Sequence, residues 1–415
     1  MATIVITSHG TLGDNLPFVS LGQALKAKGH RVRMAIGEPM HPYALKAGLE
    51  AVFNGHAPIG QQEAQQHSQS WNHLSANKLW SHDALLYGFW LHLTQGLPCL
   101  LNACQGADLL ISTPQQNAIA AIVHEKLAVP WLPASVAPSL HCWERKQAQS
   151  VQSNEKTITS EVTSSYQFDE LIQKARLTLG LAEFPPEQWS RYCWCDRLLL
   201  ASSPHFSQPV SSYAHAVQTG FWFYEDPEWS NWQPDRELQD FVEREPKPLV
   251  LSFSSQPLED SRSVVEIHVR AAAKLGQRIL IQQGWADFNE RHLPSDIDQS
   301  QVKFIGFMPQ DWLFARTAAL IHHGGIGTTA RALRNSCPML VEPYGNDQFF
   351  NARQIVLLGV GAAMHPMKLT VEELARVLQE KVLTSEYKQQ AETLGHKIRE
   401  EQGLETACSL IEDGL

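Results

Sequence analysis

Short apolar runs alternate with helical patterns in two stretches of the chain, and this alternation constrains the fold more than any other sequence feature. The first 36 residues hold an apolar run at 4–6, a Gly-rich turn, a helical pattern at 16–28 and a second apolar run at 31–36. The helical pattern has the i, i+3, i+4, i+7 spacing of a crossover helix packed on a parallel sheet, with Phe18, Leu21, Gly22 and Leu25 on one face. The opening therefore predicts a βαβ unit.

The alternation continues through both halves of the chain. In the first half, further strands are predicted at 109–112, 131–134 and 198–201, with a helix at 117–127. In the second half the predicted elements are, in order, strand 249–253, helix 264–275, strands 278–282, 302–305 and 319–322, helix 328–334 and strand 339–341. The predicted fold class is therefore α/β, with a doubly wound parallel sheet in each half.

A proline-rich, charged stretch at 225–248 separates the two halves and predicts a surface linker. A chain of 415 residues has room for two or three domains, at roughly 100–200 residues each. We therefore expect a Rossmann-like domain at 1–225, a second at 226–395, and a helix at 396–415 that packs back toward the first. Two such domains are expected to face each other across a cleft, with ligands at the strand-to-helix turns.

Charge and cysteine content narrow the choice of partners and compartment. With 33 Lys and Arg against 43 Asp and Glu, the net charge is −10, which is the wrong sign for a nucleic-acid-binding protein. The seven cysteines are odd in number and lack C-x-x-C spacing, as expected of reduced thiols in the cytoplasm. Residues 2–7 are typical of a first strand rather than a signal peptide. The apolar stretch at 84–101 predicts a buried helix and no transmembrane segment, because it is interrupted by His92, Gln95, Gly96 and Pro98.

The turn after the strand at 319–322 has the composition of a phosphate-binding site. It contains two histidines, three glycines and two threonines, in the order His322, His323, Gly324, Gly325, Ile326, Gly327, Thr328, Thr329. Glycines let the backbone approach an anion, the following helix favours negative charge at its N-terminus, and the other side chains add donors. The alternative is a tight connection whose threonines only cap the helix. The turn is neither a Walker loop nor G-x-G-x-x-G.

A second polar turn carries Asp347 and Gln348 directly after a strand. A carboxylate beside an amide suits the vicinal hydroxyls of a sugar. Asp347 could equally be the N-cap of a helix that runs to Leu358. The segment 306–310 (Gly-Phe-Met-Pro-Gln), the His-Gly-Gly turn and the Asp-Gln turn follow one another in this order, and their combination is specific.

With these motifs the sequence resembles the UDP-glycosyltransferase superfamily, the inverting GT-B transferases that glycosylate small and lipidic acceptors. The resemblance covers nearly the whole chain and looks closest to the bacterial branch of sterol glucosyltransferases, rhamnolipid rhamnosyltransferases and antibiotic glycosyltransferases. That branch shares the His-His-Gly-Gly turn and openings like 10–18 (Gly-Thr-Leu-Gly-Asp-Asn-Leu-Pro-Phe). The resemblance implies a GT-B fold, in which the first domain binds the acceptor and the second binds a nucleotide sugar, with a UDP-hexose expected.

The resemblance also implies roles for residues of the second half. Phe307 stands where an aromatic ring stacks on the base, with Gln310 nearby. Asp347 and Gln348 would hold the donor sugar. The diphosphate would be faced by residues of two turns, namely Ser255, His323, Gly325, Gly327 and Thr328.

Two positions depart from the family pattern. Ser254 stands where the family often has Gly. Arg331 stands where plant members have a Glu that binds the ribose. Bacterial members often lack that Glu as well, so uridine remains the expected nucleoside.

Sugar transfer needs a base for the acceptor hydroxyl and an anion site for the leaving diphosphate. The resemblance places the base at Asp14, in the first strand-to-helix turn. From the residues alone, Asp14 could equally be the N-cap of the helix that begins near Pro17. His9 could be a second base, a hydrogen-bond partner of Asp14, or a histidine satisfied within the structure. The implied mechanism inverts the anomeric configuration.

No metal ion or other cofactor is expected. The only Asp-x-Asp, Asp296 to Asp298, is typical of a solvated loop, and the Gly-rich helix start already supplies positive potential. The expected acceptor is a bulky apolar alcohol, such as a sterol, hydroxy-lipid or polyketide, and peripheral membrane contact is compatible with it. Candidate acceptor-binding residues are Trp80, Phe89 and Trp90, although large aromatic side chains can equally be core.

The sequence leaves other functions open. The Gly-rich first turn and Glu38 suggest an NAD-linked oxidoreductase, but the turn lacks G-x-G-x-x-G spacing and puts a carboxylate where pyrophosphate would lie. A sugar-nucleotide epimerase or a nucleotide-binding auxiliary protein would keep the fold without transfer. An epimerase would need no large acceptor pocket.

Overall fold

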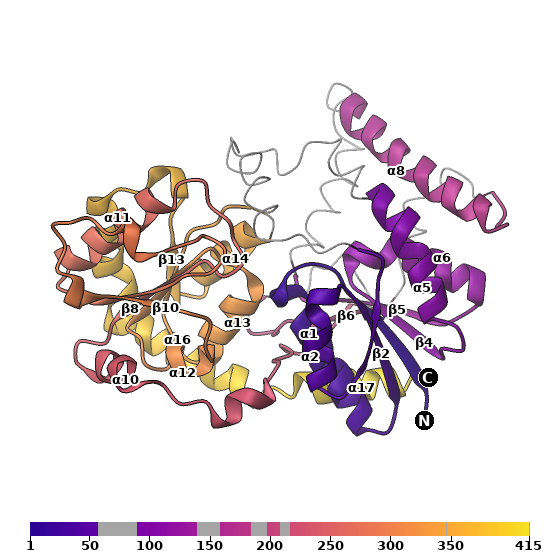
Figure 1. Ribbon diagram of the computed structural model, residues 1–415, viewed down its shortest axis with the longest axis horizontal. Helices are drawn as coiled ribbons and strands as arrows, with labels where there is room; N and C mark the ends of the chain where they lie inside the picture. The colour runs from indigo at the N-terminus through magenta and orange to yellow at the C-terminus, as the bar shows by residue number, and fades with distance from the viewer. Residues whose placement is uncertain (57–88, 139–157, 184–196, 208–215, 346, 415) are drawn as a thin grey trace. The chain divides into compact units, whose positions relative to one another are not determined.

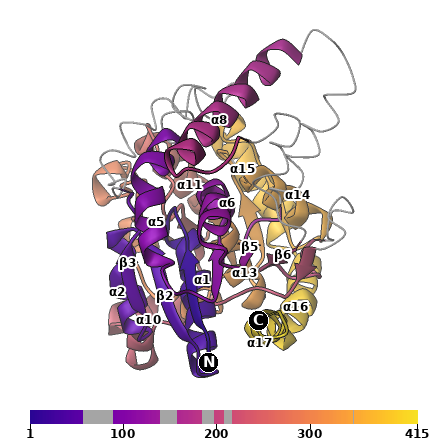
Figure 2. The same ribbon diagram turned by 90° about the vertical axis from the view of Figure 1, so that its right-hand side faces the viewer.

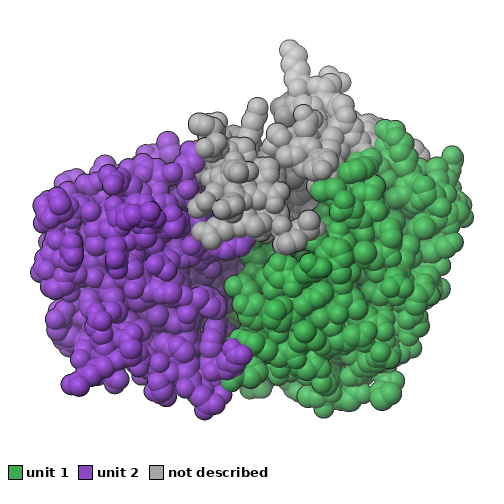
Figure 3. Space-filling model, in the orientation of Figure 1, with its two compact units in different colours: residues 1–58, 80–227, 402–415 green, residues 59–79, 228–401 purple. Residues whose placement is uncertain are grey.

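The computed structural model describes residues 1–56, 89–138, 158–183, 197–207, 216–345 and 347–414. These residues form two compact units, shown in different colours in Figure 3. The first unit takes its residues from 1–58, 80–227 and 402–415, and the described residues of the second unit span 228–401.

The first unit contains a seven-stranded parallel sheet with strand order β3-β2-β1-β4-β5-β6-β7 (Figure 1). Its strands are β1 (Thr3–Thr7), β2 (Arg31–Ile36), β3 (Glu50–Phe53), β4 (Leu109–Ser112), β5 (Trp131–Ser135), β6 (Leu198–Leu200) and β7 (Ala216–Gln218). Its helices are α1 (Leu12–Ala27), α2 (His41–Lys46), α5 (Leu97–Ala103), α6 (Asn117–Leu127), α8 (Ile158–Thr178) and α17 (Gly403–Glu412), with short turns η1 (Glu38–Met40), η2 (His92–Gly96) and η3 (Pro114–Gln116).

The second unit contains a six-stranded parallel sheet with strand order β10-β9-β8-β11-β12-β13. Its strands are β8 (Leu249–Ser252), β9 (Ile279–Gln282), β10 (Val302–Ile305), β11 (Ala319–His322), β12 (Met339–Val341) and β13 (Gly361–Ala363). Its helices are α10 (Arg236–Glu243), α11 (Ser261–Lys274), α12 (Gln310–Phe314), α13 (Ile326–Arg334), α14 (Gln348–Leu357), α15 (Val371–Val377) and α16 (Ser385–Glu400). Short turns are η5 (Pro227–Asn231), η6 (Glu290–His292), η7 (Gln299–Gln301), η8 (Pro366–Lys368) and η9 (Leu378–Val382).

Both sheets have the doubly wound order that reverses direction next to the first strand, so the predicted α/β class with two Rossmann-like sheets is confirmed. The reversal lies between β1 and β4 in the first unit and between β8 and β11 in the second. At such a point the two neighbouring crossovers lie on opposite faces, and this leaves room for a ligand at the carboxyl ends of the strands. The turns after β1, β8 and β11 are therefore the expected positions of ligand-binding and catalytic residues.

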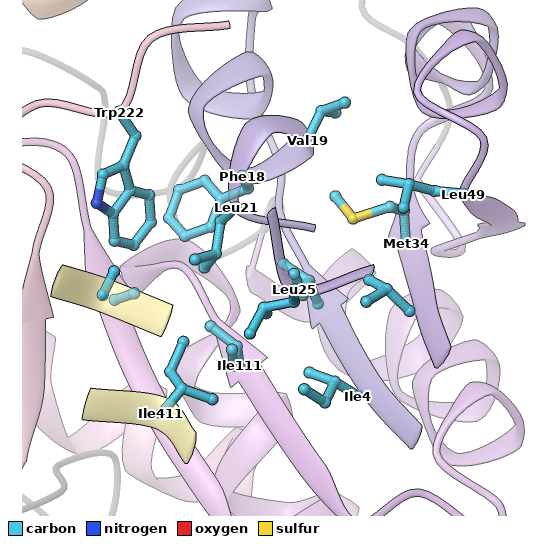
Figure 4. Packing of buried hydrophobic residues seen from close by; sticks show 14 of the residues in the cluster. Ile4, Phe18, Val19, Leu21, Leu25, Met34, Leu49, Ile111, Trp222 and Ile411 are labelled. Carbon is cyan, nitrogen blue, oxygen red and sulfur yellow. The ribbon is translucent and has the colours of Figure 1, made fainter. Parts of the chain in front are cut away.

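Helices cover both faces of the first sheet. On one face, α1, α2 and α17 pack over alternate residues such as Ile4 and Ile6, and Figure 4 shows Phe18, Leu21 and Leu25 of α1 in this layer together with Ile411 of α17. On the other face, α5, α6 and α8 pack over Val5; Figure 2 shows these three helices toward the viewer. The predicted inward face of the first crossover helix is thus confirmed.

Helix α1 and the helix expected at 84–101 differ from the sequence prediction in their bounds. Helix α1 begins at Leu12 rather than near 16, so Pro17 lies inside it. The expected buried helix at 84–101 is described only from residue 89, where it continues through the π-helical turn η2 into α5. In the described part of the chain, every helix is too short or too polar to cross a bilayer.

Candidate functional site

The turn between β11 and α13 is built around two glycines. Gly324 has φ +94°, and a Cβ there would lie 2.7 Å from Val341 Cγ1, so only glycine suits this position. Gly325 is the N-cap of α13, and it provides no side-chain hydrogen bond to the helix. A Cβ on Gly325 would lie 2.5 Å from His323 Nε2, which places the His323 imidazole directly beside the start of the helix. The first N–H groups of α13 thus have no capping side chain and a histidine next to them.

Both histidines of this turn are buried and neutral at pH 7. Burial lowers the pKa of His323 to about 4, against the smaller opposing effect of a hydrogen bond with the Ser252 backbone. Burial, followed by the neighbouring His323, lowers the pKa of His322 well below its usual range. The Gly324 N–H donates to His322 Nδ1 (3.2 Å), so the proton of His322 lies on Nε2. His323 therefore brings no positive charge to this turn at neutral pH.

Thr328 and Gly327 occupy the first turn of α13, as the sequence predicts, and Thr328 is buried. The neighbouring Thr329 uses its hydroxyl internally, because it donates to the Gly325 carbonyl (2.9 Å). This bond fixes the N-cap backbone from within the helix. The arrangement has the features of a helix N-terminal anion site, namely free N–H groups, the positive end of the helix dipole and nearby neutral donors.

The turn between β12 and α14 is tied to the first turn through Asn351. Asp347 occupies the N-cap position of α14, but its side chain makes no capping hydrogen bond to the helix. Asn351 Nδ2 donates both to Asp347 Oδ2 (2.8 Å) and to the Gly324 carbonyl (2.9 Å). Sequence reasoning missed Asn351, although its position four residues after Asp347 was a signal. The carboxylate expected to hold a sugar is thus fixed relative to the His-Gly-Gly turn.

Gln348 joins this assembly to the segment after β8. Its Oε1 accepts from the backbone N–H groups of Tyr344 (2.7 Å) and Gly345 (3.0 Å), and its Nε2 donates to Gln256 Oε1 (3.1 Å). Gln348 is buried, and these bonds use its oxygen and one of its two amide hydrogens. The residue expected to bind sugar therefore also holds two turns together.

Ser255 and Ser254 follow β8. Ser255 is partly exposed beside the buried Gln256. Ser254 has φ +48°, a left-handed conformation that favours glycine, and its carbonyl accepts from the N–H of Trp285 (2.7 Å). A glycine would adopt this conformation at lower cost.

Phe307 and Gln310 lie beyond β10. Phe307 is 56% exposed, and its ring lies against that of Trp229, with centroids 5.5 Å apart. Gln310 is the first residue of α12 and is partly exposed. Arg331, which stands where plant members have the ribose-binding Glu, is ion-paired with Asp311.

In the first unit, Asp14 belongs to the start of α1. Thr11 is the N-cap and Asp14 the third residue of the helix, so the interpretation of Asp14 as N-cap is wrong. Asp14 Oδ2 accepts from the backbone N–H (2.7 Å) and the hydroxyl (3.1 Å) of Thr11. A capping box starts the helix at Leu12, ahead of Pro17, which is the reason that α1 begins earlier than expected. Gly10 has φ +126°, and a Cβ there would lie 2.3 Å from Asp14 Oδ2.

Burial raises the pKa of Asp14, and the two hydrogen bonds from Thr11 oppose that effect without cancelling it. The carboxylate therefore holds a proton more strongly than an ordinary aspartate. The residue is still partly exposed. A carboxylate with these properties is a suitable proton acceptor for a hydroxyl.

His9 lies in a cluster of three histidines. Its ring centroid is 4.6 Å from that of His56 and 5.0 Å from that of His92, and the last two are 3.9 Å apart. The Gln116 amide donates to His92 Nδ1 (3.0 Å). Burial lowers the pKa of all three, to about 4 for His56 and about 3 for His92. Within the described residues, His9 and Asp14 form no hydrogen bond with each other. Sequence reasoning missed His56 and His92 because they come from segments far from His9 in the chain.

Two of the three expected acceptor-binding aromatics are described. Trp80 lies outside the described residues. Phe89 packs edge-on against Phe168, with centroids 5.0 Å apart, and Trp90 is 44% exposed. Both directly precede the π-helical turn that carries His92.

The Asp-x-Asp segment has a structural role. Asp296 accepts two hydrogen bonds from the Arg270 guanidinium (2.8 and 3.0 Å), and Asp298 caps a short turn through Ser300 N–H (3.0 Å). In the described part of the chain, no three His, Cys, Asp or Glu side chains are grouped so that they could hold a metal ion.

Comparisons with known proteins agree with this arrangement. Residues 4–141 match the glycosyltransferase family 28 N-terminal domain, and residues 269–406 match the C-terminal domain described as erythromycin biosynthesis protein CIII-like. Together these matches cover about two thirds of the chain.

Curated relatives include a sterol 3-beta-glucosyltransferase of Aspergillus fumigatus, 28% identical over 98% of this chain and 29% of the relative. A protein of the same name from Komagataella phaffii is 27% identical over 98% of this chain and 34% of the relative. The chain thus spans about a third of the length of these relatives.

Among solved structures, the glycotransferase of kitacinnamycin has a TM-score of 0.77 at 18% identity and covers 100% of this chain and 99% of that one. The glycosyltransferase VinC in complex with dTDP has a TM-score of 0.73 at 17% identity and covers 99% of this chain and 98% of that one. These likenesses show the fold.

Proposed function

This chain belongs to the UDP-glycosyltransferase superfamily of GT-B glycosyltransferases, and on that premise we propose that it is an inverting hexosyltransferase that moves a hexose from a nucleoside diphosphate to a hydroxyl of an apolar acceptor. The observation that carries the proposal is the uncapped start of α13 beside the neutral His323. This start offers backbone donors and a positive dipole end where a diphosphate would gain negative charge as it leaves.

The second unit would hold the donor. Gly325, Gly327, Thr328 and His323 would bind the diphosphate, and Ser255 would face it from the end of β8. Asp347 and the remaining amide hydrogen of Gln348 would bind hydroxyls of the sugar, and the exposed Phe307 ring would stack on the base, with Gln310 beside it. Uridine is the expected nucleoside, and thymidine is the alternative to test, because VinC was solved with dTDP.

The first unit would supply the base. Asp14 would accept the proton of the acceptor hydroxyl as its oxygen attacks the anomeric carbon from the face opposite the diphosphate. The bond from that carbon to the diphosphate oxygen breaks, and the nucleoside diphosphate leaves with the electron pair. One displacement inverts the anomeric configuration. We propose that no metal ion is needed, since the helix start supplies the positive potential.

The acceptor would be a bulky apolar alcohol. The curated relatives are named sterol 3-beta-glucosyltransferases, which makes a sterol the first compound to test. Trp90 and Phe89, next to the histidine cluster, are the described aromatic candidates for contact with it. A cytoplasmic enzyme of this type would meet activated sugars where they are made, and peripheral membrane contact would give it access to lipidic alcohols.

The test begins with ligand binding. Thermal shifts with UDP, dTDP, GDP and NADH separate the proposal from an oxidoreductase, and stabilisation by NADH alone would refute the transferase. The protein is then incubated with UDP-glucose and cholesterol in detergent, and glycosylated product is sought by mass spectrometry, with EDTA in a parallel reaction to test metal independence.

The variant Asp14→Asn tests the base. The amide keeps an oxygen that can accept from Thr11 N–H but loses its capacity to take a proton, so turnover should fall by about 10²–10⁴-fold. UDP binding should be unchanged. A matched control is Asp235→Asn, because Asp235 also accepts a backbone hydrogen bond at a helix start, from Leu238 N–H (2.7 Å). Full activity of Asp14→Asn would show that another group is the base.

A further inference from the structure

The Phe307 ring stands at the end of β10 and is exposed, whereas other phenylalanines of the same unit, such as Phe253 and Phe288, are fully buried. Gly306 precedes it, and a Cβ on this glycine would meet no atom within 4 Å. The Phe307 ring is more than half exposed and follows a glycine with open space around it, so few neighbouring atoms restrict the orientation of the ring. A ring that stacks on a nucleobase needs a fixed orientation, because stacking depends on the position of the ring.

The backbone side of Phe307 is held by Gln282. This residue ends β9 and is buried, and its Nε2 donates to the Gly306 carbonyl (3.1 Å). Its Oε1 accepts from the buried Ser252 hydroxyl (2.6 Å), so both ends of the amide are fixed. The position of the Phe307 backbone is thereby set by a side chain from the middle of the sheet.

The same row of the sheet leads to the diphosphate turn. Ser252 is the register partner of Gln282 on one side and of His322 on the other. His322 in turn accepts from the Gly324 N–H (3.2 Å). Gln282 thus fixes the Gly306 side of this row, whereas the diphosphate turn is held on the other side by its own bond from Gly324 N–H to His322.

The ring side of Phe307 is held by Trp229, from the segment η5. The two ring planes are inclined by 53° with centroids 5.5 Å apart. A base inserted between two rings needs two contact spacings, about 7 Å in total, so no base fits between them. Trp229 therefore supports one side of Phe307 and leaves the other side for a base.

Trp229 is itself anchored. The Trp232 N–H donates to the Trp229 carbonyl (3.2 Å), and the Trp232 ring packs against Trp312 of α12, with centroids 5.1 Å apart. Residues 229–232, at the start of the second unit, thus pack against the rest of that unit through two aromatic contacts.

We propose that Trp229 and Gln282 are positioning residues for the donor nucleobase, a pyrimidine of a nucleoside diphosphate, and act by fixing Phe307 as a one-sided stacking platform. This inference rests on the proposed function. It assigns part of the base site to the start of the second unit, which lies outside both matched family domains. It also separates two determinants of donor binding, since the diphosphate contacts at α13 involve neither residue.

The experiment measures calorimetric binding of UDP, dTDP and inorganic pyrophosphate to the full chain. Trp229→Ala and Gln282→Leu should weaken the binding of the preferred nucleotide at least tenfold and leave pyrophosphate binding within twofold of the unaltered protein. Trp229→Phe should restore nucleotide binding to within about threefold, because it keeps a ring against Phe307. Gln277→Leu, a change at the opposite end of β9, is the matched control and should bind like the unaltered protein.

The outcomes are distinct. Nucleotide binding that is unchanged in Trp229→Ala and Gln282→Leu overturns this inference and leaves the proposed function standing. Equal weakening of nucleotide and pyrophosphate also overturns it, because it shows only a loss of structure, which melting curves of each variant would register. If the unaltered protein binds pyrophosphate but neither nucleotide, the proposed function fails together with the inference.

Discussion

At the scale of single residues, Asp14 serves the start of a helix and, in the proposed mechanism, the chemistry. It is the third residue of α1 and accepts two hydrogen bonds from Thr11, yet burial still raises its pKa. Hydrogen bonds to the charged form and burial act in opposite directions, and here burial has the larger effect. The result is a carboxylate that is oriented by its cap and has more affinity for a proton than usual.

A pH dependence follows from this shift. Only the deprotonated carboxylate can act as base, so kcat/KM should fall as pH drops through the pKa of Asp14, which lies above its ordinary value of 3.8. The measurement is a profile of kcat/KM against pH. His9→Asn is the control, since the pKa of His9 is also shifted, downward by burial, and this variant should keep the acidic limb. Loss of the limb in His9→Asn would identify His9 as the base instead.

Ser254 provides a test of backbone strain. Ser254 has φ +48°, and this backbone conformation costs more free energy for a serine than for a glycine. Ser254→Gly should therefore stabilise the second unit by about 0.5–1 kcal/mol. Urea unfolding would measure the change. Ser255→Gly, at the next position and without positive φ, should destabilise by a similar amount. A Ser254→Gly variant less stable than the unaltered protein would contradict the strain argument.

At the scale of elements, sequence analysis found the interior strands of both sheets and one edge strand, β10. β4 and β8 are wholly buried, and their apolar residues follow one another without interruption, a pattern that predicts a buried strand. The missed strands are β3 and β7 at the edges of the first sheet and β13 at the edge of the second. β3 begins with Glu50, which pairs with Arg33, and β13 begins with Gly361, so each has only a short apolar run of two or three residues. Edge strands gain their place from their neighbours rather than from their own residues.

The parts of the candidate site that were predictable are those in which all the characteristic residues lie within one turn. The His-Gly-Gly turn and the N-cap Asp347 lie where the residues predict. The contacts that assemble the turns were not predictable, because Asn351, Gln348 and Gln282 bond to the turns that follow other strands. The start of α1 was missed because the cap at Thr11 outweighs the usual effect of Pro17.

The start of α13 gives a prediction for a helix terminus. In Gly325→Ala the new methyl group would lie 2.5 Å from His323 Nε2, so the buried imidazole must leave its place beside the first N–H groups. We expect the Kd for UDP to rise at least tenfold by calorimetry. Gly13→Ala is the matched control, because its methyl group would lie 3.9 Å from the nearest atom, Thr11 Oγ1, which is ordinary contact. Unchanged UDP binding in Gly325→Ala would exclude this helix start as the diphosphate site.

At the scale of the whole molecule, α17 returns to the first unit after the chain has formed the second. Ala407, Cys408 and Ile411 are buried in the core that also holds Phe18 and Trp222. At the same place Lys28 makes ion pairs with Glu412 and Glu405, and His30 Nε2 forms a hydrogen bond with Glu412. The last helix is therefore part of the first unit.

The contribution of α17 can be measured at Ile411. Ile411→Ala removes buried methyl groups from this core and should cost about 2–5 kcal/mol in the unfolding free energy of the first unit. Denaturant unfolding followed by tryptophan fluorescence would report it, since Trp222 lies in the same core. Ser409→Ala, on the exposed side of α17, should change stability by no more than about 0.5 kcal/mol. Similar small effects from both variants would show that α17 is dispensable for this core.

The return of α17 also sets an order of events during synthesis. The ribosome releases β1 and α1 early, then all of 228–401, and only then the helix that completes the first core. The second unit can therefore close while the first still exposes the apolar surface that α17 will cover. The unit whose first strand is synthesised first thus completes its core last. The apolar surface that α17 later covers is the one that a chaperone bound to the nascent chain would contact.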